Sequence, residues 1–208
     1  MALRCCLYMI VGSLCVSCGA DDDSAAFESS TGDESSARID YPIDLGSLYV
    51  PSGRMGDAEA GAPYVYFDSD YGGLRRPGDH DGFVTRISYS AGPAGSAGMS
   101  WQWPEGNWGE SPGRSLSARR VAFLARGETG GELVEFRVGG IGSNGEQLFR
   151  DSVDRSSGGI RLEPDWKRYE IDLSGQDLSS VISGFAWIVE ARANVEPVVF
   201  FIDNVSFE

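Results

Sequence analysis

Hydrophobic and polar residues alternate with a period of two along most of the chain from Ile39 onward. The alternation is clearest in the segments 83–89, 120–126, 132–138, 169–173 and 185–189. This period is typical of strands that bury one face, and Gly, Pro, Asn or Asp separates the segments. Residues 198–202 are apolar at every position, which predicts a central strand covered on both faces.

Helical spacing of apolar residues is missing beyond the N-terminal region, although 177–182 could form one short turn of helix. Many short strands without intervening helices predict an all-β fold, a single β-sandwich or jelly roll. The length of 208 residues has room for one such domain, which we place at 39–208, and a tail.

The N-terminal region predicts export. Residues 1–17 carry Arg4 followed by the apolar run 5–16, a pattern typical of a signal peptide and too short to span a bilayer. The chain's cysteines all lie within its first eighteen residues, at Cys5, Cys6, Cys15 and Cys18. The predicted sandwich therefore has no disulfide and no thiolate chemistry.

Val16-Ser17-Cys18 resembles the signal of bacterial lipoproteins, whose cysteine is lipidated and becomes the first mature residue. The sequence departs from that motif at Cys15, where leucine is usual. The resemblance implies a lipid anchor at Cys18, and Gly19 after it is compatible with sorting to the bacterial outer membrane or cell surface. An ordinary signal peptide is the alternative.

Residues 18–38 are expected to be the lipidated cysteine and a disordered acidic tether. Residues 19–38 hold six acidic side chains and a single aromatic one, Phe27, so they cannot bury enough apolar surface to offset ordering. The acidic run 21–23 is either a surface-export signal or a solvating segment.

The net charge of −14 excludes most nucleic-acid binding, which needs clustered Lys and Arg to neutralise phosphates. His80 is the single histidine, so a metal site built on several imidazoles is excluded. His80 also has no recognisable nucleophile partner, because the predicted sandwich has neither a G-x-S-x-G motif nor a cysteine. These observations favour binding over catalysis.

The order of the strand segments resembles galactose-binding-like jelly-roll carbohydrate-binding modules. The resemblance rests on YVPSGRMGD at 49–57, LARGETGGELVEFRVGG at 124–140, LEPDWKRYEIDLSGQDLSSVISGF at 162–185 and VFFIDNVSFE at 199–208. It covers 45–208 and implies a domain that binds glycans without cleaving them, often with a structural calcium ion.

Three tryptophans in a Gly/Pro-rich stretch, Trp101, Trp103 and Trp108, are the first candidates for ligand contacts. An indole offers a large flat surface at low entropic cost, and the C–H face of a sugar can pack on it. Trp101 and Trp103 share one face of a strand, which is either a binding face or the core. Gln102, Asn107 and Arg114 are the candidates for polar contacts with the sugar.

Asp203 is the first candidate metal ligand, because it interrupts an apolar strand where an uncompensated carboxylate is costly to bury. A calcium ion, which takes several oxygen ligands, would compensate it. The resemblance implies that the opening segment lies beside Asp203, so Asp57 or Glu59 would supply further oxygens. A backbone hydrogen bond at a strand end is the alternative.

The sequence thus predicts a lipid-anchored, non-catalytic carbohydrate-binding domain. A structural or assembly lipoprotein that binds a protein partner through the same face is one alternative. A small glycan-active enzyme is another, because glycoside hydrolysis needs only two carboxylates, for which Glu105, Glu110, Glu132 and Glu135 are candidates. Glu132 and Glu135 are three apart on an expected strand, which places them on opposite faces.

Overall fold

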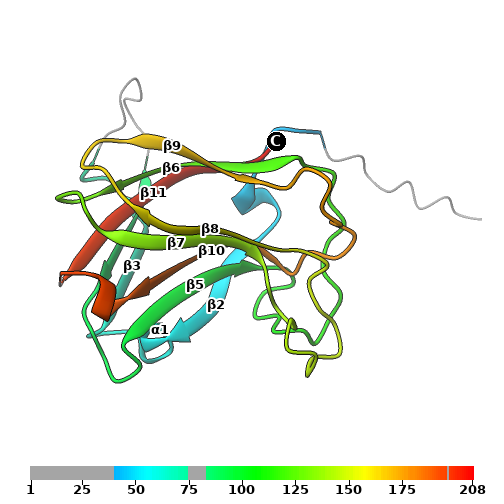
Figure 1. Cartoon of the computed structure of the whole chain (residues 1–208), viewed down its shortest axis with the longest axis horizontal. Helices are drawn as coiled ribbons and strands as arrows, with labels where there is room; N and C mark the ends of the chain where they lie inside the picture. Colours follow the sequence, from blue (N-terminus) through cyan, green and yellow to red (C-terminus); the bar gives the residue numbers. More distant parts are fainter. Residues whose placement is uncertain (1–39, 75–82, 196) are drawn as a thin grey trace, which may run out of the picture. The chain divides into compact units, whose positions relative to one another are not determined.

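The computed structural model describes residues 40–74, 83–195 and 197–208. The predicted signal peptide, Cys18, the acidic tether and His80 lie outside these residues. In the described part, two antiparallel sheets form a sandwich and lie one above the other in Figure 1. The predicted all-β sandwich of the jelly-roll type is confirmed.

Sheet A has the strand order β3-β4-β11-β6-β9, and β1 pairs with the end of β11. Its strands are β1 (Ile43–Asp44), β3 (Val65–Tyr71), β4 (Val84–Tyr89), β6 (Arg120–Gly127), β9 (Lys167–Asp172) and β11 (Val198–Phe207). Because β11 lies between β4 and β6, the expectation of a central strand at 198–202 is confirmed.

Sheet B has the order β2-β5-β10-β7-β8. Its strands are β2 (Val50–Gly56), β5 (Ser96–Gln102), β7 (Leu133–Gly139), β8 (Asp154–Arg161) and β10 (Ser183–Glu190). The register places Trp187 of β10 opposite Met99 of β5 and Phe136 of β7. This register fixes which side chains of the three central strands share a face.

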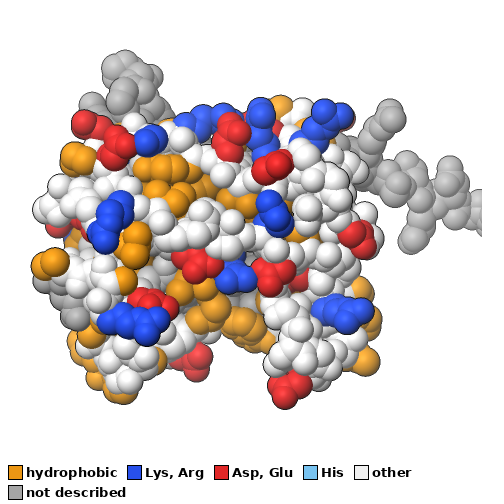
Figure 2. All heavy atoms as spheres, in the orientation of Figure 1, with side chains coloured by type: hydrophobic (Ala, Val, Ile, Leu, Met, Phe, Trp, Pro, Cys, Tyr) orange, Lys and Arg blue, Asp and Glu red, His pale blue; other side chains and the backbone are white. Residues whose placement is uncertain are grey.

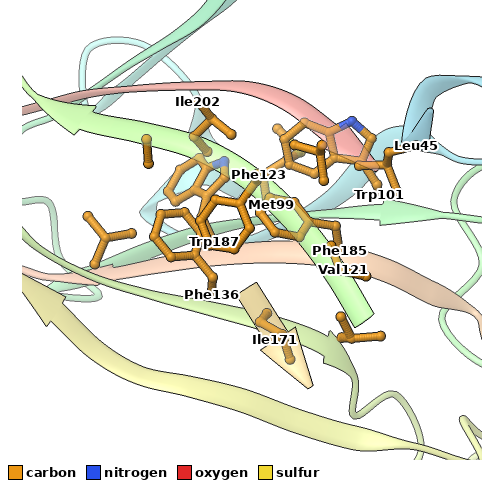
Figure 3. Close-up of a cluster of buried hydrophobic side chains, with 14 of the residues drawn as sticks. Leu45, Met99, Trp101, Val121, Phe123, Phe136, Ile171, Phe185, Trp187 and Ile202 are labelled. Carbon is orange, nitrogen blue, oxygen red and sulfur yellow. The ribbon is translucent and has the colours of Figure 1, made fainter. Parts of the chain in front are cut away.

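The core lies between the two sheets and is rich in aromatic side chains, including Phe123, Phe136, Phe185 and Trp187 (Figure 3). Phe185 packs 5.2 Å from Phe123 and 5.7 Å from Phe136, measured between ring centroids. The alternating residues of β10 therefore face inward, which leaves Ala186 and Ile188 on the outer face of sheet B.

A second, smaller cluster covers the outer face of sheet A and consists of Val84, Val199 and Phe201 with the partly buried Tyr71, Leu74 and Trp166. Trp166 lies 6.5 Å from Phe201 between ring centroids. This cover explains why β11 is apolar at successive positions, because both of its faces are buried.

Helical structure in the described residues is limited to α1 (Asp57–Ala60) and two 3-10 turns, Leu45–Ser47 and Ala191–Ala193. The expected turn of helix at 177–182 is wrong: Val181 instead forms a β-bridge with Arg114, and the Asp177 carboxylate accepts a hydrogen bond from the Ser179 N–H. Within the described ranges, no helix has the length and apolar character needed to cross a bilayer.

Candidate functional site

Trp108 stands on a loop that the side chain of Asn107 holds together. Asn107 Nδ2 donates to the carbonyl oxygens of Trp103 and Ser111 at 3.1 and 2.9 Å. Its Oδ1 accepts from the N–H groups of Gly109, Glu110 and Ser111 at 3.0, 3.0 and 3.1 Å. A single buried amide therefore satisfies five backbone groups of the loop, which fixes the position of the neighbouring indole.

Two neighbouring segments support this loop from either side. The Gly106 N–H donates to Ser52 Oγ on β2 at 2.9 Å, and the Phe149 N–H donates to the Gly109 carbonyl at 2.9 Å. Gly109 has a φ of +100°, and a Cβ there would lie 2.5 Å from Gln147. Glycine is thus required at this close approach of two loops.

Trp108 is 40% exposed and borders a hollow of about 360 Å³ on the outer face of sheet B. We call this the Trp108 hollow; it is lined by Met55, Ser100, Trp108, Arg137, Gly139, Gly140, Ile141, Gly142, Ser143, Asn144, Gln147, Ser183, Ala186 and Ile188. Figure 2 shows this face hollowed at its lower edge, with hydrophobic side chains in the notch and charged side chains beside one another above it.

A second hollow of about 550 Å³ also borders the indole and is lined by Ser52, Arg54, Met55, Glu59 and Trp108. Met55 and Trp108 line both hollows. The exposed indole therefore borders open space in both hollows and can pack against a flat apolar ligand face.

Small side chains make the floor of the Trp108 hollow. Ser100 and Ser183 come from the adjacent strands β5 and β10, and their hydroxyl oxygens lie 2.7 Å apart. A Cβ on Gly98 of β5 would lie 2.8 Å from the Met55 methyl group, so the glycine lets Met55 lie over the sheet. Both serines are buried, and their hydroxyl groups bond to each other beneath the hollow.

The carboxylate of Asp151 joins the base of the β7–β8 loop to the start of β10. It accepts hydrogen bonds from the N–H groups of Ile141 at 2.8 Å, Ser183 at 3.3 Å and Ile182. Burial raises the pKa of Asp151 to about 6, although these three donors favour the ionised form. Ile141 and Ser183 both line the Trp108 hollow, so this contact shapes it.

The structure removes Trp101 and Gln102 from the predicted ligand contacts. Trp101 is 8% exposed and packs in the core 5.7 Å from Phe185 between ring centroids. Gln102 is fully buried beneath β2, where its Oε1 accepts from Ser52 Oγ at 3.3 Å. The sequence left open whether the strand face of Trp101 is a binding face or the core, and the structure shows that it is the core.

Trp103, Asn107 and Arg114 are the other predicted sugar contacts near Trp108. The Arg114 guanidinium lies 4.3 Å from the centroid of the Trp103 ring, and its Nε donates to the Leu48 carbonyl at 3.1 Å. Neither residue lines either hollow at Trp108. Asn107 is 4% exposed, with its amide engaged by the loop backbone. Asn107 is thus corrected from a sugar contact to a residue that positions Trp108. Trp103 and Arg114 stay predictions as sugar contacts, outside the two hollows.

Met55 and Arg137 are lining residues that the sequence analysis missed. Arg137 sits on β7 between two carboxylates, with Nη1 at 3.0 Å from Glu135 Oε1 and Nη2 bonded to Asp154 Oδ1. Its alternation with Val134, Phe136 and Val138 marks it as outward-facing. The sequence does not reveal that a loop and a neighbouring strand turn this part of the outer face into a hollow.

The predicted calcium ligands Asp203, Asp57 and Glu59 do not come together, so they do not fit a shared ion site. Asp57 bonds to the hydroxyl of Tyr89, and Tyr89 pairs with Val198 on β11. Asp203 lies five residues further along β11, which is about 16 Å from Val198. Glu59 is exposed beside Trp108. Among the described residues, no group of three or more His, Cys, Asp or Glu could hold a metal ion.

Asp57 has a structural task. Its Oδ1 accepts from the Ala94 N–H at 2.8 Å, and its Oδ2 accepts from the Gly92 N–H and the Tyr89 hydroxyl, each at 2.9 Å. Burial opposes the charge, but these donors outweigh it and lower the pKa of Asp57 below its usual value. The carboxylate fastens the start of α1 to the β4–β5 connection.

The arrangement offers contacts for binding and no evident pair of hydrolytic carboxylates. The lining of the Trp108 hollow contains no carboxylate, and that of the second hollow contains Glu59 alone. Glu132 is buried with its Oε1 bonded to Thr129, and Glu135 is bonded to Arg137. Glycoside hydrolysis needs two carboxyl groups facing one bond, which these linings do not present.

No protein-family model and no curated protein matches the sequence. A family 30 carbohydrate-binding module aligns at 16% identity over 77% of this chain and 93% of that chain, with a TM-score of 0.49. The family 11 module of a cellulosomal cellulase of Clostridium thermocellum aligns at 14% identity over 83% and 95%, with a TM-score of 0.46.

TmCBM61, solved in complex with beta-1,4-galactotriose, aligns at 17% identity over 82% of this chain and 96% of that chain, with a TM-score of 0.41. Similarity at this level assigns neither a ligand nor a site to this chain. The residues around Trp108 have to carry any functional conclusion.

Proposed function

We propose that this domain binds carbohydrate, without cleaving it, in the Trp108 hollow and the adjoining second hollow. The observation that carries the proposal is the indole of Trp108, 40% exposed and fixed on a loop that Asn107 holds rigid. A preorganised aromatic surface costs little entropy when a sugar ring packs on it.

The polar surroundings of the indole suit a polyhydroxylated ligand. Asn144 and Gln147 line the hollow from the β7–β8 loop, and Arg137 lines it from β7. Amide groups donate and accept hydrogen bonds, and a guanidinium donates several, so hydroxyl groups can be paired from more than one side. Apolar lining such as Ile188 and Met55 would contact the C–H faces.

A glycan-array screen of the full chain tests the proposal. We expect retention on at least one class of oligosaccharide, with no release of shorter products from it. Silence across the array by a protein with the circular dichroism of a folded β-sandwich would overturn carbohydrate binding. That outcome would favour the alternative of a protein partner on the same face, where Leu148, which follows the lining residue Gln147, is 82% exposed.

We propose further that the domain is held at a bacterial membrane surface by a lipid on Cys18, on the support of the signal-like residues 1–17 and the small residues before that cysteine. Labelled palmitate fed to expressing bacteria is expected to enter the wild type and not a Cys18→Ser variant. Equal labelling of both proteins, or of neither, would contradict the anchor.

A further inference from the structure

Arg137 is held in a clamp of two carboxylates at the edge of the Trp108 hollow. Its Nη1 bonds to Glu135 Oε1 at 3.0 Å, and its Nη2 bonds to Asp154 Oδ1 on the neighbouring strand β8. Ser156 Oγ also donates to Glu135 Oε1 at 2.6 Å, which fixes the first carboxylate. One N–H group on each arm of the guanidinium is therefore engaged, and its plane is set.

Two consecutive glycines at the end of β7 allow the clamp to close. Gly139 and Gly140 have φ values of +77° and +96°, which favour glycine. A Cβ on Gly140 would lie 3.3 Å from Asp154 Oδ1, and one on Gly139 would lie 1.8 Å from the Val153 carbonyl. The backbone here is shaped so that Asp154 can reach Arg137.

The clamp sets the charge of the hollow. Arg137 is the single charged side chain in its lining, and Glu135 and Asp154, which pair with it, add two negative charges beside it. One positive and two negative charges leave a local net charge of −1, in a chain of net charge −14. Burial disfavours the charge of Arg137, but the two carboxylates outweigh burial and raise its pKa.

We infer that the clamp makes the site selective for neutral glycans and against glycans that carry carboxylates, an inference that rests on the proposed function. A guanidinium normally binds a carboxylate with two parallel N–H groups. Here the protein's own carboxylates take that role. The remaining N–H groups of Arg137 donate to ligand hydroxyls, while a uronate meets a locally negative surface.

The test compares two oligosaccharides of equal length and linkage, a mannan-type oligomannose and the corresponding oligomannuronate, which differ only in a hydroxymethyl group replaced by a carboxylate. A glucan-type and glucuronan-type pair is run beside them. Affinities are measured by calorimetry on the full chain at physiological ionic strength, where the screening length of about 8 Å suppresses the charge of distant residues.

For the wild type we expect at least about tenfold tighter binding of the neutral member of whichever pair binds. The Glu135→Gln and Asp154→Asn double variant frees the guanidinium, so the affinity ratio should move toward the uronate by at least about tenfold. Asp154→Asn alone should move the ratio the same way by less, and serves if the double variant fails to fold.

The matched control is the Glu163→Gln and Glu170→Gln double variant, which also removes two carboxylates that form ion pairs. Their partners are Lys167 and Arg168, in β9 of the other sheet. It should leave the affinity ratio unchanged. An unchanged ratio in the folded Glu135/Asp154 variants, or a wild type that prefers the uronate, would overturn the inference alone. Absence of binding to any glycan would overturn the proposed function and this inference with it.

Discussion

Replacing Trp108 by alanine is expected to weaken glycan binding by at least about thirtyfold, or about 2 kcal/mol, as for a central aromatic contact. The indole borders both hollows, so its removal takes away the flat surface that each of them shares. Titration calorimetry with the best ligand from the array would measure the loss.

The fold should tolerate this change, because Trp108 lies outside the core cluster. We expect the free energy of unfolding to fall by no more than about 1 kcal/mol, as for other surface substitutions. Tyr66→Ala is a matched control, since it removes a 57% exposed aromatic ring from β3 of the other sheet. Wild-type affinity in folded Trp108→Ala would contradict the site.

Much of the sandwich follows from the alternation of side chains. The inward positions of β7 and β10, such as Phe136 and Trp187, repeat every second residue, and the same period places Arg137 on the outer face. β8 escaped the sequence analysis because DRSSGGIR has almost no apolar residue. It is an edge strand with its side chains mostly in solvent, so burial imposes no pattern on it.

The candidate site was only partly predictable. Its position in a Gly/Pro-rich stretch made Trp108 a candidate ligand contact, and the structure leaves its side chain 40% exposed. Strand parity placed Trp101 on one face but could not say that this face is the core. Which residues a side chain faces depends on strand register and on how the two sheets pack, and the pattern of one strand does not contain that information. The clamp at Arg137 joins β7 to β8, and fourteen residues of irregular chain connect these two strands. No short sequence motif therefore predicts that Arg137 and Asp154 meet.

Asn107→Ala is expected to impair both the loop and the binding while Trp108 itself remains. The change removes five hydrogen bonds to the loop backbone. A buried hydrogen bond typically contributes about 1 kcal/mol to the free energy of unfolding. Partial hydration of the loosened loop should offset some of this. We therefore expect a loss of about 2–3 kcal/mol in the free energy of unfolding.

Binding should fall by up to as much as in Trp108→Ala, because the ligand would have to order the loop before the indole could contact it. Hydrogen exchange gives a readout at the loop itself: the amides of Gly109, Glu110 and Ser111 should lose protection, while those of β10 keep theirs. Glu105→Ala, an exposed change in the same loop, is the control. Retained loop protection in Asn107→Ala would mean that other contacts, such as Gly106 with Ser52, suffice to hold the indole in place.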